Sequence, residues 1–98
     1  MTEAFTRWAS AEYLKTEEDM ADYLDACIEE AGDDPAFIAK ALGTIARARG
    51  MMQVARDAGL SRESLYRALS GEGNPELGTI LKVIKALGLK LHFSPLPS

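Results

Sequence analysis

Hydrophobic residues recur every three or four positions in five stretches of the chain, so the pattern predicts a largely helical protein. Each stretch places its apolar residues on one helical face, which we expect to point toward a shared core. The expected inward positions are Met20, Leu24, Cys27, Ile28 and Ala31; Ile38, Ala41, Leu42, Ile45 and Ala46; Val54, Ala58 and Leu60; Leu65 and Ala68; and Leu77, Ile80, Leu81, Ile84 and Leu87.

Residues that begin or end helices separate these stretches. Thr16 precedes three acidic residues, a combination typical of a capped N-terminus with favourable charges over the first turn. Asp34 followed by Pro35 is a second start, and glycines follow the apolar runs. The expected boundary residues are Thr16, Gly32, Asp34, Pro35, Gly50, Asn74 or Pro75, and Gly88.

The segment from Leu89 to Phe93 alternates apolar and polar residues, which predicts a short, half-buried β-strand. A lone strand needs a partner. We expect that partner to be either an extended segment over residues 5–8 or the same strand of a second subunit. Pro95 and Pro97 are expected to end the ordered chain.

Residues 51–70 carry the pattern of a helix-turn-helix. Ala55 is small where a second helix must pack closely, and Gly59 follows where the chain needs a left-handed conformation. Leu60 is then a buried turn residue, and Ser61 is a good N-cap for the next helix. The alternative is two ordinary helices joined by a glycine turn.

Length and composition favour one intracellular domain. With 98 residues and 47% hydrophobic content, the chain is long enough for one modest core. We divide it into an acidic extension and helix (1–33), a helix-turn-helix core (34–88) and a strand with a tail (89–98). No apolar run reaches membrane-spanning length, no signal peptide is evident, and the single cysteine suits a reducing cytoplasm.

The net charge of −4 hides two opposite halves. Residues 1–34 hold eleven acidic against two basic residues, a net charge of −9, whereas residues 35–98 hold nine basic against four acidic residues, a net charge of +5. A basic half can neutralise phosphates, and an acidic helix can meet a basic protein. A solvated acidic helix without a partner is the alternative.

The second helix of the motif displays the candidate DNA-reading residues. Arg62, near its N-terminal tip, suits a bidentate contact to guanine, and Glu63 suits cytosine or the orientation of Arg62. Tyr66 and Arg67 each suit a base or phosphate contact, whereas Ser61 is expected mainly to cap the helix. The full candidate set is Arg49, Gln53, Arg56, Ser61, Arg62, Glu63, Tyr66, Arg67, Ser70 and Asn74.

The sequence offers little for catalysis. His92 is the only histidine and is expected to face solvent, while Cys27 lies within an apolar helical stripe. One histidine and one cysteine form no metal-ligand cluster. The residues 71–73 lack the flanking pattern of a phosphate-binding loop. We therefore expect no enzyme activity, no metal and no cofactor.

The helices of residues 35–90 resemble the Cro and lambda-repressor class of DNA-binding domains. A closer resemblance, to addiction-module antidote proteins, spans nearly the whole chain. It is carried by Trp8, Ala11–Leu14, Tyr23–Leu24, Ala46–Met51, Gly59–Tyr66, Gly73–Pro75 and Leu87–Leu89. One position departs from the Cro pattern: Met51 stands where many such domains place a phosphate-binding glutamine, and Gln53 lies on a different face.

The resemblance implies an all-α, lambda-repressor-like domain of five helices, to which the residue pattern adds an acidic N-terminal helix and a short C-terminal β-strand. It also implies the antitoxin of a type II toxin-antitoxin module, which binds operator DNA as a homodimer, represses its own promoter and neutralises a ribosome-dependent RNase-type toxin. We expect that toxin to be small and basic. The alternatives are a prophage-type transcriptional regulator without a toxin partner and a module that binds only proteins.

Overall fold

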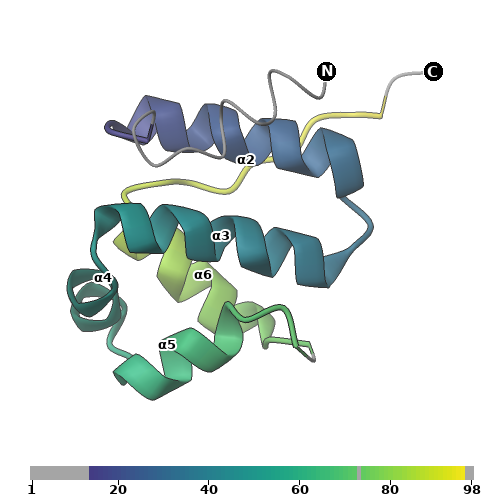
Figure 1. The fold of residues 1–98 in the computed structure, drawn as a ribbon. Helices are drawn as coiled ribbons and strands as arrows, with labels where there is room; N and C mark the ends of the chain where they lie inside the picture. Colours follow the sequence, from purple (N-terminus) through teal and green to yellow (C-terminus); the bar gives the residue numbers. More distant parts are fainter. Residues whose placement is uncertain (1–13, 73, 97–98) are drawn as a thin grey trace.

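The computed structural model describes residues 14–72 and 74–96, and these residues form five helices (Figure 1). The helices are α2 (Glu17–Ala31), α3 (Pro35–Arg49), α4 (Met51–Ala58), α5 (Arg62–Ala68) and α6 (Leu77–Ala86). The all-helical expectation therefore agrees with the structure of this part of the chain. The segment expected over residues 5–8 lies outside the described residues.

The prediction of a C-terminal β-strand is wrong. Residues 89–96 contain no strand, and Leu91 and Phe93 are exposed. The backbone N–H of Leu89 donates to the carbonyl of Ile84 at 3.1 Å, so the start of this segment completes the end of α6. Alternation alone does not make a strand, because a ladder needs a second chain segment to hydrogen-bond with. The described residues provide none.

Helices α2 and α3 begin where the sequence predicts. The Thr16 hydroxyl accepts a hydrogen bond from the Asp19 N–H at 3.1 Å, and the Asp19 carboxylate accepts one from the Thr16 N–H at 3.2 Å. This reciprocal pair is a capping box. Asp34 caps α3 without a reciprocal bond: its carboxylate accepts from the Ala36 N–H at 3.0 Å, and Pro35 occupies the first helical position.

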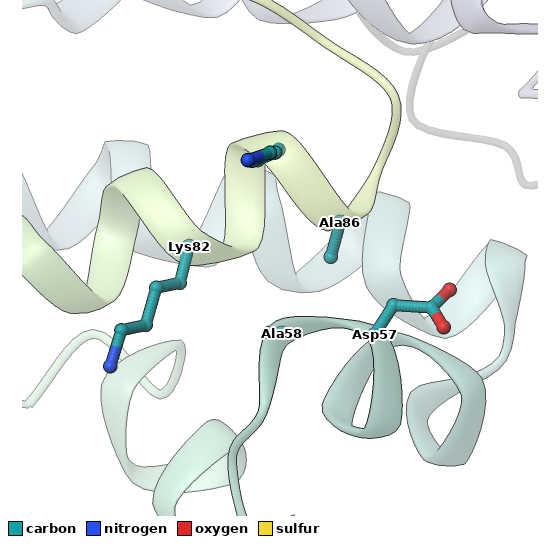
Figure 2. A pocket seen from close by; sticks show the side chains of 5 residues that line it. Asp57, Ala58, Lys82 and Ala86 are labelled. Carbon is teal, nitrogen blue, oxygen red and sulfur yellow. The ribbon is translucent and has the colours of Figure 1, made fainter.

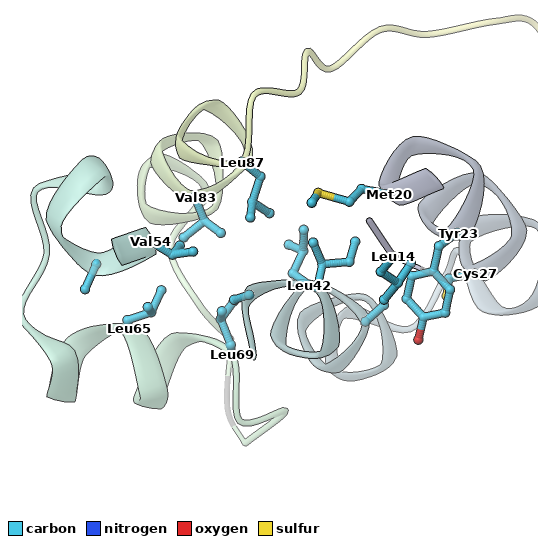
Figure 3. Packing of buried hydrophobic residues seen from close by; sticks show 14 residues of the cluster. Leu14, Met20, Tyr23, Cys27, Leu42, Val54, Leu65, Leu69, Val83 and Leu87 are labelled. Atoms are coloured by element: carbon cyan, nitrogen blue, oxygen red, sulfur yellow. The ribbon is translucent and has the colours of Figure 1, made fainter. Parts of the chain in front are cut away.

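The long helix α3 lies at the centre of the molecule (Figure 1). It packs against α2 and α4, and α4 in turn packs against α5 and α6. Fully buried side chains from every helix meet in one continuous core (Figure 3). The largest of them are Met20, Leu42, Ile45, Leu65, Leu87, Val54, Val83 and Cys27.

Two helices bury most of the residues expected to face inward, but not all of them. Leu77 and Leu81 are 69% and 42% exposed, and Val83 is fully buried instead. Six of the ten residues of α6 are apolar, so helical spacing alone did not single out Val83, which is buried in the core together with the expected Leu87. In α2, likewise, Ile28 is 48% exposed and Tyr23 is buried.

None of the helices described here is long and apolar enough to cross a lipid bilayer.

Candidate nucleic-acid interface

A glycine turn joins α4 to α5. Gly59 has φ +72°, in the left-handed region, and the Leu60 N–H returns to the Ala55 carbonyl at 2.9 Å. A β-carbon at Gly59 would meet no atom within 4 Å, so it is the backbone conformation, and not crowding, that favours glycine here. Ala55 is buried beside the turn, as its small size predicts.

Ser61 caps α5 as expected. Its hydroxyl accepts from the Ser64 N–H at 3.0 Å and donates to the Ser64 hydroxyl at 2.9 Å. Both hydrogen-bonding functions of this hydroxyl are therefore used within the helix. The geometry favours a structural role for Ser61, and it fixes the first turn of α5, on which Arg62 stands.

The outward face of α5 carries most of the residues selected from the sequence. Leu65 is fully buried, and it directs the opposite face of this seven-residue helix to solvent. Five candidates from α5 and the loop that follows it are exposed: Arg62, Glu63, Tyr66, Arg67 and Ser70.

Arg62 and Tyr66 contact each other on this face. The guanidinium carbon of Arg62 lies 5.4 Å from the centre of the Tyr66 ring, which is within the range of a cation–π interaction. Their separation of four residues places them one helical turn apart on the same side. Arg62 is thus held along the helix surface with its N–H groups still available.

The side chains on α4 bond to one another. The Gln53 amide donates to the Asp57 carboxylate at 2.9 Å and accepts from the Arg56 guanidinium at 3.4 Å. Both ends of the Gln53 amide are therefore occupied, while Arg56 keeps most of its donors. Of these two candidates, Arg56 is the better placed to contact a phosphate.

Arg49, a candidate for phosphate contact, forms contacts with α2. Its guanidinium donates to the Glu17 carboxylate at 3.0 Å and to the sulfur of Met20 at 3.6 Å. The pKa of Glu17 is lowered, first by a hydrogen bond from its own backbone and then by Arg49. Arg49 was predicted from the sequence to contact a phosphate. Its contact with Glu17 was not predicted, because the two residues lie 32 positions apart.

The loop after α5 holds the last two candidates. The Ser70 hydroxyl donates to the Arg67 carbonyl at 3.0 Å and accepts from the Glu72 N–H at 3.2 Å, so it shapes the turn. Asn74 is exposed, but it does not start the next helix. The N-cap is Glu76, so the predicted start of α6 is wrong by one or two residues.

The acidic face predicted for the first helix is present on α2. This helix contains seven acidic residues and no basic ones, and six of the seven are exposed. Figure 1 shows α2 and α5 on opposite sides of α3. The acidic surface and the arginine-bearing surface therefore lie on different sides of the molecule.

A shallow hollow opens between α4 and α6 (Figure 2). It is lined by Asp57 and Ala58 from α4 and by Lys82, Lys85 and Ala86 from α6. The described residues include no buried charged or polar side chain that would bind a ligand within it. Its two lysines, for which the sequence predicted no role, add positive charge beside the end of α4.

The chemistry of the core is inert. Burial raises the pKa values of the Cys27 thiol and the Tyr23 phenol, so both groups stay protonated at neutral pH. In residues 14–72 and 74–96, no group of three histidine, cysteine or acidic side chains is arranged to hold a metal ion.

The chain is similar to known proteins over nearly its whole length. The family model described as "Probable addiction module antidote protein" matches residues 4–95. An uncharacterized protein of Haemophilus influenzae is 52% identical over 92 residues, which cover 94% of this chain and 93% of that relative. No solved structure gives a significant match. The chain therefore belongs to the family of probable addiction module antidote proteins.

Proposed function

We propose that this protein is an antitoxin that binds operator DNA through α4 and α5 and represses its own promoter. The observation that carries the proposal is the outward face of α5, where Arg62, Tyr66 and Arg67 are exposed beside a capped N-terminus. In a helix-turn-helix, the second helix enters the major groove and its N-terminal residues contact base edges. Arg62 occupies that position and would donate to guanine O6 and N7.

We propose that two copies bind together on two half-sites about one helical turn apart. A single domain of this size covers too little DNA for tight, selective binding. Two copies would double the number of base contacts and phosphate contacts. Symmetric repeats in the operator would then mirror the two-fold axis of the dimer.

The second half of the proposal concerns α2, which would bind a small basic toxin of the ribosome-dependent RNase type. Two observations support this half: the family is one of probable antidotes, and α2 carries seven acidic residues and no basic ones. Because α2 and α5 lie on opposite sides of α3, both partners would fit at the same time (Figure 1).

The DNA half is tested by titrating the purified protein against a labelled fragment of its own promoter at several salt concentrations. We expect selective binding that weakens with salt, and we expect Arg62→Ala to cost about 1–3 kcal/mol and relax one base position. Lys90→Ala removes the same charge from the C-terminal segment and is the matched control. Equal binding to unrelated DNA by all three proteins would refute operator recognition.

The toxin half is tested with the product of the reading frame beside the gene. We expect the protein to bind it and to stop it from cleaving messenger RNA in a translation reaction. Asp22→Asn with Asp25→Asn and Glu29→Gln should weaken this inhibition and leave promoter binding intact. Selective promoter binding without any toxin inhibition would favour a transcriptional regulator without a toxin partner.

A further inference from the structure

We propose that Tyr66 is a positioning residue, whose ring holds the Arg62 guanidinium in place for base contact. This inference rests on the proposed operator binding and assigns a role within it. It differs from the sequence expectation, in which Tyr66 itself touches a base or a phosphate. The supporting observation is the 5.4 Å separation between the Arg62 guanidinium carbon and the centre of the Tyr66 ring.

The ring is the group that orients Arg62 in this structure. No carboxylate of the described residues lies within ion-pair distance of Arg62, since the ion pair found among them joins Arg49 to Glu17. Glu63 is adjacent in sequence, and neighbours on a helix do not face each other. The nearby Ser61 and Ser64 hydroxyls bond to each other. Tyr66 therefore supplies the contact that restricts the Arg62 side chain.

This contact suits base recognition because of the shape of the guanidinium. An arginine that lies over an aromatic ring at cation–π distance can still direct N–H groups outward along the edge of its guanidinium. Those N–H groups are the ones that would meet guanine O6 and N7. A side chain already held in this way loses less conformational freedom when it binds DNA, so the protein should bind more tightly.

The test compares Tyr66→Phe with Tyr66→Leu by fluorescence anisotropy on the promoter fragment. Phenylalanine keeps the ring and removes the hydroxyl, whereas leucine removes the ring. We expect the affinity of Tyr66→Leu to fall about two- to fivefold, the range of an exposed cation–π contact. Tyr66→Phe should bind as the parent does. The leucine variant should also discriminate less between guanine and adenine at the position that Arg62 reads.

A double-mutant cycle separates positioning from direct contact. In an Arg62→Ala background, Tyr66→Leu should cause no further loss, because nothing remains to be positioned. An additional loss in that background, or an equal loss for Phe and Leu, would overturn the positioning role. Circular dichroism of each variant checks that the helices are retained.

The same measurements separate this inference from the proposed function. If Arg62→Ala weakens binding and Tyr66→Leu does not, the positioning role alone is refuted. If Arg62→Ala leaves promoter binding unchanged, the assignment of Arg62 fails, and the role of Tyr66 fails with it.

Discussion

The Glu17 carboxylate accepts a hydrogen bond from the Arg49 guanidinium at 3.0 Å, and this contact joins the first turn of α2 to the last turn of α3. Arg49 also reaches the sulfur of Met20, which is fully buried. The acidic helix is thereby attached to the core immediately before α4 begins. Glu17 is the member of the acidic set that has a structural partner at this junction.

Glu17→Gln should remove a contribution to stability that depends on pH. Because the pKa of Glu17 is lowered in the folded protein, its contribution is complete above the ordinary value of 4.5 and is lost as pH falls through the lowered value. We expect the variant to be less stable than the parent at pH 7 and the difference to vanish in acid. Urea unfolding at several pH values measures this.

Glu18→Gln is the matched control for that experiment. Glu18 lies in the same first turn and is exposed, and it has no ion pair among the described residues. Both substitutions therefore change the interaction with the helix dipole, and only Glu17→Gln removes the contact with Arg49. An identical pH dependence for the two variants would contradict the importance of this ion pair.

Arg49→Gln should leave the salt dependence of promoter binding unchanged, because its guanidinium is engaged by Glu17. Each phosphate contact that is removed lowers the slope of log affinity against log salt by about 0.9. Arg67→Gln is the comparison, and we expect it to lower the slope if Arg67 contacts a phosphate. A fall of about 0.9 for Arg49→Gln would mean that Arg49 leaves Glu17 for the DNA backbone.

Gly59→Ala should destabilise the protein by about 1–2 kcal/mol, the cost of a left-handed conformation for a residue with a β-carbon. The space around Gly59 is open, so the cost is one of backbone conformation alone. Gly59→Asn should cost less, because asparagine tolerates this conformation better.

Gly78→Ala tests the opposite case, because Gly78 lies within α6 without a positive φ and also has open space around it. It should stabilise the protein by about 0.5–1 kcal/mol. Chemical denaturation compares all three variants with the parent. Equal effects of alanine at positions 59 and 78 would contradict the assigned role of the turn.

Local signals in the sequence predict the local structure well. Thr16, Asp34 and Ser61 cap helices as expected, and Gly59 makes the expected turn, because each acts on backbone groups within a few residues. Relationships over long distances were not predictable in this way. The partner of Arg49 lies 32 residues away, and sequence spacing carries no information about it.

The β-strand predicted for the C-terminal segment was wrong for a similar reason, because its formation depends on a distant partner. The alternation of apolar and polar residues is consistent with a strand that has one buried face, but a strand also requires a second segment to hydrogen-bond with its backbone. The candidate face of α5 was predictable because one buried residue, Leu65, fixes the orientation of a short helix. The face of α6 was predicted only in part: Ile80, Ile84 and Leu87 lie in or against the core as expected, but spacing alone did not single out Val83 over Leu77 and Leu81.

The inward and outward leucines can be compared directly in solution. Leu65→Ala should destabilise the protein by about 2–5 kcal/mol, because Leu65 is fully buried and its truncation leaves a cavity between α5 and the core. Leu77→Ala makes the same chemical change on a side chain that is mostly exposed, so we expect a change within about 0.5 kcal/mol. Urea unfolding of both variants measures the difference. A large loss of unfolding free energy for Leu77→Ala would mean that the first turn of α6 is covered in solution. If a second copy of the protein covers it, raising the protein concentration would stabilise the parent more than the variant.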